Sequence, residues 1–331
     1  MREITLSQAV NEAIAEEMRR DEAVVLLGED VAEAGTPFKV LSGLVEEFGT
    51  ERVLDTPISE PGFAGIAVGA AMTGLRPIVD LMFGDFLFLV MDQICNQAAK
   101  THYMSGGKLN VPMVLRTNLG ATRRSAAQHS QSLHALVSHI PGLKVALPSS
   151  AYEAKGLMKT AIRDNNPVVI FEDKLMYQDK AEVPEEEYSI PFGEANILLE
   201  GKDITVIATS SMVQIAQKSA VELDRRGISV EVIDPRTLVP FDEETVVRSV
   251  NKTSRALIID EGHQSFGVSA EIAARISEKS FYYLDAPVQR MGAMDVPVPF
   301  SPALEDLTVP DVNTVCERIE KLLSEGFFDG Q

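Results

Sequence analysis

The chain contains few of the residues on which several classes of site depend. Tryptophan is absent, and only two cysteines, Cys95 and Cys316, occur in 331 residues. Because these thiols lie far apart in the sequence and form no C-x-x-C pair, a zinc ribbon or a thioredoxin-like redox site is excluded. Two scattered thiols are typical of a reducing compartment.

Basic residues and long apolar runs are also scarce. Lys and Arg total 30 against 49 Asp and Glu, which gives a net charge of −19. This balance argues against nucleic acid and anionic membranes as partners, because both need a basic protein surface. No run approaches the roughly 20 apolar residues of a membrane span, and the first residues lack the apolar region of a signal peptide. We therefore expect a cytoplasmic protein.

What the chain does have is apolar material in a regular alternation. The hydrophobic share is 45%, enough for large cores, and the length fits two domains at roughly 150 residues each. We predict strands at residues 24–27, 52–54, 77–82, 113–117, 144–147 and 168–171. Helices are predicted between them, at residues 6–20, 40–48, 62–73, 87–103, 130–138 and 151–164. This order predicts a parallel sheet with helices on both faces.

The composition changes at residues 179–191, where acids and prolines dominate and the hydrophobic residues follow neither a helix nor a strand period. The alternation then resumes, with strands predicted at residues 204–208, 229–233, 256–260 and 282–284. Helices are predicted at residues 213–226, 243–251, 268–276 and 312–323. We therefore predict an α/β protein of two doubly wound domains, residues 1–178 and 200–331, joined by a linker at residues 179–199.

The most informative segment is residues 55–74, DTPISEPGFAGIAVGAAMTG, which indicates a strand end, a turn and a helix of small residues. Glu60 lies just before that helix, at the edge of a parallel sheet where ligands bind. Gly62, Gly65 and Gly69 leave one side of the helix without side chains, so another backbone could come close. The alternative for Glu60 is simple complementation of the helix dipole, worth roughly 0.3–1 kcal/mol.

A second segment, residues 120–132, follows a predicted strand and leads into His129. A histidine at this edge can act as a general acid or base, or it can have a structural or capping role. His129, His134 and His139 are spaced by five, so on a helix they would fan out instead of forming a metal-binding face.

Two further segments have both a purely structural and a functional interpretation. Met82 and Phe86 follow a strand end and could wall a flat heteroaromatic ligand, or they could be core residues. In residues 161–167, Asp164, Asn166 and helix-terminal carbonyls could hold a hard monovalent cation, or form a helix C-cap before proline. The sequence has no Gly-Asp-Gly motif with a later Asn, so another chain would have to hold a diphosphate cofactor.

These motifs together resemble a known family. They are residues 55–69, 103–107, 126–131, 141–144, 154–157, 162–168 and 284–287. Across its whole length the chain resembles the β subunit of the thiamine-diphosphate-dependent first component of 2-oxo acid dehydrogenase complexes, and within that family the pyruvate and acetoin types. The resemblance implies a pyrimidine-binding α/β domain followed by a transketolase C-terminal-like domain.

The resemblance also implies roles for individual residues. Glu60 matches the glutamate that binds the 1′ nitrogen of the cofactor's aminopyrimidine and so promotes deprotonation of the thiazolium, which then serves as electron sink. Met82 and Phe86 match residues that line the aminopyrimidine. His129 matches a histidine that assists acyl transfer to lipoamide. A structural potassium site is implied at Met113, Ala161, Ile162, Asp164 and Asn166, the first three through backbone carbonyls.

The partners implied are an α subunit in an α₂β₂ heterotetramer, which carries Mg²⁺ and the diphosphate, and a dihydrolipoyl acyltransferase with its subunit-binding and lipoyl domains. The acidic charge would attract the basic subunit-binding domain, less strongly at high salt. Residues 325–331 match no family ending that we can align. Pyruvate, acetoin and branched-chain 2-oxo acids all stay open as the small-molecule substrate. A branched-chain 2-oxo acid dehydrogenase β subunit, a non-catalytic scaffold subunit and a self-sufficient transketolase-like enzyme are the alternatives.

Overall fold

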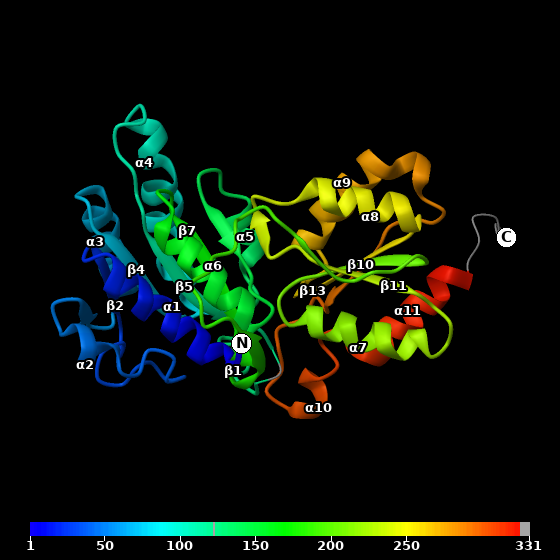
Figure 1. The fold of residues 1–331 in the computed structure, drawn as a ribbon, viewed down its shortest axis with the longest axis horizontal. Helices are drawn as coiled ribbons and strands as arrows, with labels where there is room; N and C mark the ends of the chain where they lie inside the picture. The colour runs from blue at the N-terminus through cyan, green and yellow to red at the C-terminus, as the bar shows by residue number, and fades with distance from the viewer. Residues whose placement is uncertain (122, 325–331) are drawn as a thin grey trace.

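The computed structural model describes residues 1–121 and 123–324, and it consists of two lobes, each built on its own sheet (Figure 1). Among the described residues, the main sheet of the N-terminal lobe has seven strands: β2 (Val24–Gly28), β3 (Val53–Asp55), β4 (Arg76–Phe83), β5 (Val114–Leu119), β6 (Lys144–Ala146), β7 (Val168–Asp173) and β12 (Thr237–Val239). Their spatial order is β12-β6-β7-β5-β4-β2-β3. All neighbouring pairs are parallel except the edge pair β12 and β6.

Helices cover both faces of this sheet. One face packs against α1 (Leu6–Arg20), α2 (Leu44–Phe48) and α6 (Ala151–Arg163). The other packs against α3 (Glu60–Met72), the 3₁₀ helix η1 (Gly84–Leu89), the π-helical η2 (Asp92–Ala98) and α5 (His134–Ser138). The sheet therefore lies between two apolar cores, as the predicted doubly wound domain requires.

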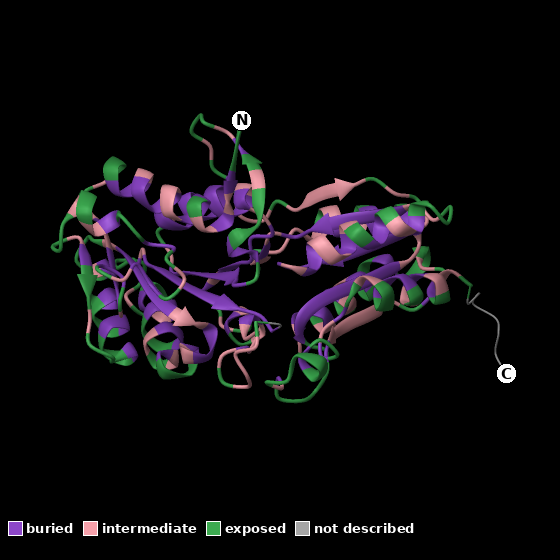
Figure 2. Ribbon diagram, turned by 90° about the horizontal axis from the view of Figure 1, so that it is seen from below, coloured by how far each residue is buried: buried purple, intermediate pink, exposed green. Residues whose placement is uncertain are grey.

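The C-terminal lobe repeats this plan around five strands: β9 (Asn196–Leu199), β10 (Ile204–Ala208), β11 (Val230–Asp234), β13 (Ala256–His263) and β14 (Gln289–Ala293), in the order β14-β13-β10-β11-β9. One face packs against α7 (Met212–Asp224) and α11 (Val312–Ser324), the other against α8 (Glu243–Thr253) and α9 (Val268–Ser280). The central strands of both lobes are buried between helices (Figure 2). The predicted fold class is confirmed.

Local chemistry explains why α1 begins and ends where the sequence predicts. Thr5 and Gln8 form a reciprocal capping box at its start. Arg19 and Arg20 lie in its last turn, where their positive charges interact favourably with the negative end of the helix dipole. Its apolar face packs against α6. Long helices of this kind are the easiest elements to predict, because period, cap and charge agree.

Two predictions about the region between the lobes need correction or stay open. Residues 179–191 are not irregular throughout, because β8 (Lys180–Val183) pairs antiparallel with β1 (Arg2–Thr5). That pairing joins segments far apart in the chain, so local composition could not reveal it. The division into domains at residues 179–199 stays a prediction, and residues 325–331 lie outside the described part.

Further elements differ from the prediction. The helix predicted at residues 40–48 begins only at Leu44, and the end of the predicted linker forms β9. Residues 282–284 are not a strand: Phe281–Tyr283 form a 3₁₀ turn, η4, and the strand is β14. Residues 87–103 are split into η1, η2 and α4 (Ala99–Met104), because the apolar run LFLVM follows no helix period. The helix predicted at residues 130–138 begins only at His134.

One strand ties the lobes together. β12 follows the C-terminal lobe's β11 in sequence, yet it pairs with β6 of the N-terminal sheet, Thr237 opposite Ala146. In the described ranges, no helix is long and apolar enough to cross a membrane.

Candidate active site

Glu60 is the first residue of α3 and lies just beyond the carboxyl end of β3. Glu60 is only 8% exposed to solvent. Within the described part of the chain, its carboxylate has no hydrogen bond or ion pair. The carboxylate therefore has unused acceptor capacity, and the N-terminus of α3 favours its negative charge. Such a group is a candidate functional residue with an unused acceptor.

A second acid lies close to Glu60. Glu29 follows β2, the neighbour of β3 in the sheet. Burial raises the pKa of Glu29, and the charges of Asp30 and Glu60 raise it further. Sequence analysis did not single out Glu29, although its position directly after a buried strand was a usable signal.

The end of β4 is distorted where Met82 lies. Met82 has a left-handed backbone, φ 57°, and the register with β5 shifts between Asp80 and Phe83. Asp80 Oδ1 accepts the Met82 N–H at 2.8 Å, and the Met82 carbonyl accepts a hydrogen bond from Thr117 Oγ1 at 3.2 Å. Bulges next to sites re-aim side chains, and such strain persists only where the surroundings enforce it.

An aromatic group gathers around His129. The ring centroid of His129 lies 4.6 Å from that of Phe83 and 5.7 Å from that of Phe86, both edge-on. The His129 carbonyl accepts a hydrogen bond from Lys174 Nζ at 2.7 Å. Burial lowers the pKa of Lys174. Phe83 and Lys174 are contacts that sequence analysis missed, because only the fold brings β4, β7 and this loop together.

The predicted catalytic and cofactor-binding residues thus share one edge of the sheet. The structure joins Phe86 and His129 directly and places Met82 at the end of the same strand, β4. Glu60 lies at the end of β3, two strands away in the sheet order, on a helix that packs against β4 and η1. No hydrogen bond or ring contact links Glu60 to His129 among the described residues.

The other two histidines of the sequence pattern have different positions. His134 is buried at the start of α5, with Nε2 3.1 Å from Asp260 Oδ2 in the C-terminal lobe. His139 is the C-cap of α5. In residues 1–121 and 123–324, no group of three or more His, Cys, Asp or Glu side chains could hold a metal ion.

The five residues of the predicted potassium site gather at the opposite edge of the sheet. The Met113 carbonyl accepts from the N–H of Val168, the first residue of β7, at 2.9 Å. Asp164 is the C-cap of α6, and its N–H donates to the Ala161 carbonyl. Asp164 Oδ1 accepts from the Asn166 N–H and Nδ2 at 2.8 and 2.9 Å. The C-cap interpretation therefore holds for Asp164.

Two cationic side chains already bind these oxygens. Arg76 donates from Nε to the Ile162 carbonyl at 2.8 Å and from Nη2 to the Asp164 carbonyl at 2.6 Å. Lys144 pairs with the Asp164 carboxylate. Burial opposes ionisation of Asp164, but the hydrogen bonds from Lys144 and Asn166 outweigh it and hold its pKa below the ordinary value. The oxygen set suits a hard monovalent cation, which would share these oxygens with Arg76 and Lys144.

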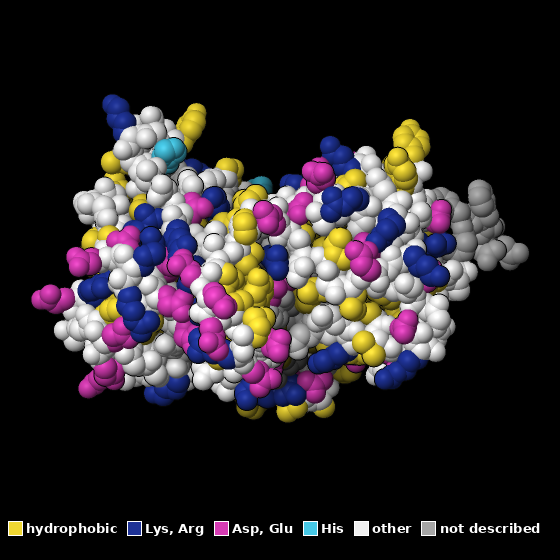
Figure 3. Space-filling model, in the orientation of Figure 1, with side chains coloured by type: hydrophobic (Ala, Val, Ile, Leu, Met, Phe, Trp, Pro, Cys, Tyr) yellow, Lys and Arg dark blue, Asp and Glu magenta, His cyan; other side chains and the backbone are white. Residues whose placement is uncertain are grey.

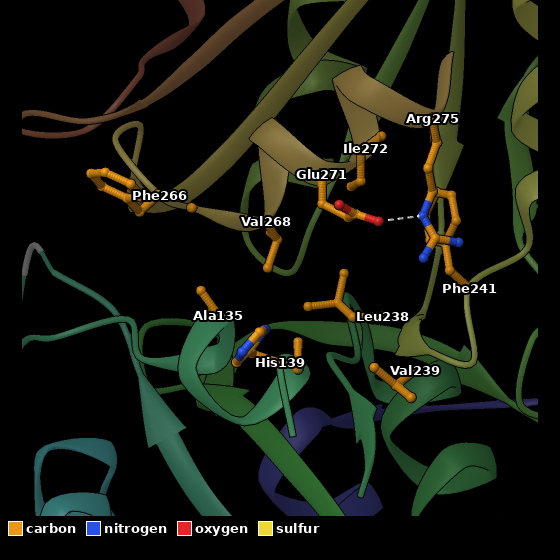
Figure 4. Close-up of a pocket in the computed structure, with 12 residues that line it drawn as sticks. Ala135, His139, Leu238, Val239, Phe241, Phe266, Val268, Glu271, Ile272 and Arg275 are labelled. Atoms are coloured by element: carbon orange, nitrogen blue, oxygen red, sulfur yellow. Dashed lines mark hydrogen bonds and ion pairs between the residues drawn. The ribbon is translucent and has the colours of Figure 1, made fainter. Parts of the chain in front are cut away.

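A separate cavity of about 360 Å³ lies between the lobes (Figure 4). None of the predicted site residues lines it. Inside it, Glu271 and Arg275 of α9 form an ion pair. Other lining residues come from three elements: Ala135, His139, Leu238, Val239, Val268 and Ile272. The candidate site is instead an open edge of the N-terminal sheet.

The surface beside that edge is apolar. Ile58 is 77% exposed, Ile66 of α3 is 65% exposed and Phe88 of η1 is 54% exposed. Tyr103 and Met104 at the end of α4 are also exposed, and α4 projects from the molecule (Figures 1 and 3). They lie toward the opposite edge of the sheet, because Tyr103 lines a pocket with Asn166. Contiguous exposed apolar surface marks interaction sites.

Comparison with known families covers most of the chain. The family described as "Transketolase, pyrimidine binding domain" matches residues 2–180. The family described as "Transketolase, C-terminal domain" matches residues 193–315.

Curated proteins are similar along nearly the full length. The acetoin:2,6-dichlorophenolindophenol oxidoreductase subunit beta of Bacillus subtilis (strain 168) is 50% identical, covering 98% of both chains. The mitochondrial pyruvate dehydrogenase E1 component subunit beta of Bos taurus is 48% identical, covering 97% of this chain and 91% of the relative. The pyruvate dehydrogenase E1 component subunit beta of Rickettsia felis is 48% identical, covering 97% of this chain and 98% of the relative.

Solved structures share the fold at low identity. A split gene transketolase, described as an inactive beta4 tetramer, superimposes with a TM-score of 0.81 at 22% identity over 97% of this chain and 99% of that chain. A transketolase variant from Pichia stipitis gives a TM-score of 0.71 at 15% identity, covering 99% of this chain and 47% of that one.

Proposed function

The chain belongs to the family of pyruvate and acetoin dehydrogenase E1 β subunits, and from this we propose that it is the β subunit of a thiamine-diphosphate-dependent pyruvate or acetoin dehydrogenase. With an α subunit it cleaves the C–C bond next to the substrate carbonyl. The acyl group is then transferred to lipoamide. The observation that carries this proposal is Glu60, a largely buried residue whose carboxylate has no partner in the described chain, at the ligand-binding edge of the sheet.

Glu60 fits the aminopyrimidine of the cofactor. Its unpaired carboxylate can accept a hydrogen bond from a protonated ring nitrogen, which would satisfy the buried group. Met82 and the half-buried Phe86 would line the flat ring. When bound, thiamine diphosphate supplies a thiazolium that acts as electron sink for the bond cleavage. The part of this chain is to hold and orient the pyrimidine.

His129 is proposed as the acid in acyl transfer. As one lipoamide sulfur forms its bond to the acyl carbon, the S–S bond breaks and the other sulfur takes a proton. An imidazole can donate that proton near neutral pH. The position of His129 at the open edge supports this role, because a lipoyl group carried by another protein must reach it.

The site is proposed to be completed by an α subunit, in an α₂β₂ heterotetramer. The exposed apolar side chains of Ile58, Ile66 and Phe88 beside Glu60 support a protein partner on this face. The sequence has no Gly-Asp-Gly motif, so the α subunit is proposed to hold Mg²⁺ and the diphosphate.

The remaining partners and the compartment are also proposals. A dihydrolipoyl acyltransferase would bind through its basic subunit-binding domain and present its lipoyl domain. The net charge of −19 supports such a basic partner, although acidic and basic side chains are interspersed on the face in Figure 3. We propose a cytoplasmic location. Relatives named as bacterial and as mitochondrial are both similar to the chain.

A potassium ion is proposed at Met113, Ala161, Ile162, Asp164 and Asn166. It would bind at the edge opposite Glu60, so its role would be to hold the end of α6 against β5 and β7. Branched-chain 2-oxo acids remain an alternative substrate class, which a substrate panel on the purified pair would test.

The test is the Glu60→Gln variant, purified with its α subunit and assayed with pyruvate and with acetoin. The amide keeps the shape of the side chain but lacks the negative charge, so we expect activity to fall by roughly 10²–10⁴-fold, the range for an acid–base group. Glu51→Gln, at an exposed position, is the matched control and should be fully active. Unchanged activity of the Glu60→Gln pair would refute the assignment of Glu60.

A further inference from the structure

The loop that carries His129, residues 123–133 (the His129 loop), connects the N-terminal lobe's β5 to α5, yet the C-terminal lobe binds it at both ends. Before it, the Ala121 N–H donates to Glu261 Oε1 of β13 at 2.7 Å. After it, His134 Nε2 lies 3.1 Å from Asp260 Oδ2, also on β13. The segment around His129 is therefore held between carboxylates of the other lobe.

A third contact with the C-terminal lobe is made by Glu305, in the short helix α10 (Pro302–Glu305). Its carboxylate accepts from the Arg124 backbone N–H at 3.1 Å and from Arg124 Nη1 at 2.8 Å. The same Nη1 donates to Asp306 Oδ1 at 2.7 Å. The Glu305 side chain is fully buried, whereas Arg124 is 36% exposed. A charge-assisted contact that binds both backbone and guanidinium fixes the loop in orientation as well as in position.

The backbone of the loop needs such a contact. Arg124 and Ala126 both have left-handed backbones, with φ 61° and 58°. Non-glycine residues in this region cost on the order of 1–3 kcal/mol each and persist only where the surroundings enforce them. The Ala126 carbonyl accepts the His129 N–H at 3.3 Å, so the strained turn leads directly to His129.

The N-terminal lobe contacts the loop at other points. Lys174 Nζ holds the His129 carbonyl, and Phe83 and Phe86 lie edge-on to its ring. These contacts restrict the ring. The N-terminal lobe also binds the two ends of the loop: Arg123 Nη1 donates to the Lys174 carbonyl at 2.7 Å, and Gln131 Nε2 donates to Asp85 Oδ1 at 2.8 Å. Arg124, the first left-handed residue of the loop, is instead bound by Glu305 of the C-terminal lobe, through its backbone N–H and its guanidinium.

We propose that Glu305 is a positioning residue for His129: through Arg124 it sets the place of the His129 loop, so the C-terminal lobe tunes the acyl-transfer step. This rests on the role of His129 proposed above. Within residues 1–121 and 123–324, Glu305 forms no hydrogen bond or ion pair with α3, so the Glu60 step should not depend on it. Loss of the contact should slow transfer to lipoamide while leaving bond cleavage intact.

The experiment uses the chain purified with its α subunit and two electron acceptors. Lipoamide on a lipoyl domain requires acyl transfer, whereas 2,6-dichlorophenolindophenol takes electrons without it. For Glu305→Gln we expect the lipoamide rate to fall by at least about tenfold, within the ~10²-fold that a 1 Å misplacement can cost. The dye rate should stay within about twofold of the parent value. The single variant Arg124→Lys, which keeps the positive charge beside Glu305, should retain most of the parental lipoamide rate.

Glu320→Gln is the matched control, because it breaks another Arg–Glu pair of the C-terminal lobe, Arg226 with Glu320 at 2.8 Å, away from the loop. It should change neither rate. Hydrogen exchange of residues 123–133 is measured in parallel and should be faster in Glu305→Gln only. If Glu305→Gln does not fold, Arg124→Met is the second variant, with the same expectations.

The outcomes separate the two proposals. His129→Ala with an unchanged lipoamide rate would refute the role of His129, whereas loop exchange would still report whether Glu305 holds the loop. A His129→Ala variant that fails with lipoamide, beside a Glu305→Gln variant with parental rate and exchange, would overturn the positioning role alone. Equal loss of the dye and lipoamide rates in Glu305→Gln would also overturn it.

Discussion

At the scale of single residues, the site depends on polar groups whose positions are set by the ends of strands. Glu60 could be singled out from sequence because an acid precedes a helix of small residues, and His129 because it follows a predicted strand. Phe83 and Lys174 could not, because their contacts with His129 come from strands that are distant in sequence. The sequence thus pointed to the candidate residues Glu60 and His129, whose roles stay predictions, but not to the residues that contact them.

A stability prediction belongs to this scale. Arg116 in β5 is 3% exposed, pairs with Asp80, and donates from Nη2 to Glu172 Oε2 at 2.5 Å. Arg116→Leu would leave two buried carboxylates without their cation, so we expect a loss of about 3–5 kcal/mol in the free energy of unfolding. Urea denaturation measures this.

Arg226→Leu is the control for that measurement, because Arg226 pairs with Glu222 and Glu320 at the surface. Its cost should be much smaller than that of Arg116→Leu, because solvent screens an exposed pair. Similar losses in both variants would show that the buried cluster contributes no more than a surface pair.

At the scale of elements, agreement between sequence and structure follows the range of the interactions. Residues 204–208 and 6–20 were predicted with the bounds that β10 and α1 have, because each carries its own period. β8 and β12 were missed because their hydrogen bonds go to β1 and β6, far away in sequence. The strand predicted at residues 282–284 was wrong, because these residues have high strand propensity but lie in an exposed turn.

The end of α6 gives an element-scale prediction. If potassium binds there, it should stabilise the N-terminal lobe, so replacing it with a large organic cation should lower the melting temperature. The oxygens already bound by Arg76 and Lys144 limit the effect to a few degrees, about what 1 kcal/mol gives in a chain of this size. Thermal denaturation in matched potassium and tetramethylammonium chloride measures it. Superimposable melting curves would count against a potassium site.

At the scale of the whole molecule, buried acids concentrate where the two lobes meet. Burial raises the pKa of Glu261 well above its ordinary value, and the nearby Asp173 of the other lobe raises it further. Burial and the charge of Glu153 likewise raise the pKa of Asp234 to about 7 from an ordinary 3.8. Its Oδ2 accepts from Ser149 Oγ of the N-terminal lobe at 2.5 Å. Protonation of these acids therefore favours the assembled lobes.

The pH dependence of stability follows from Asp234. Its folded-state pKa exceeds the unfolded value, so the folded chain binds the extra proton between about pH 4 and pH 7 and loses stability as pH rises through that window. The slope is at most ~1.4 kcal/mol per pH unit. Asp234→Asn should lack this contribution, which urea midpoints from pH 4.5 to 7.5 would reveal as a flatter profile. Identical slopes in the two proteins would contradict it.

The central claim is that this chain is one half of an active site. The most direct measurement mixes a fixed amount of the α subunit with increasing amounts of this chain and follows thiamine-diphosphate-dependent dye reduction. We predict no turnover by either chain alone and a rate that saturates at one β per α. Substantial turnover by this chain alone would contradict the account, as would a mixture that remains inactive with pyruvate, acetoin and branched-chain 2-oxo acids.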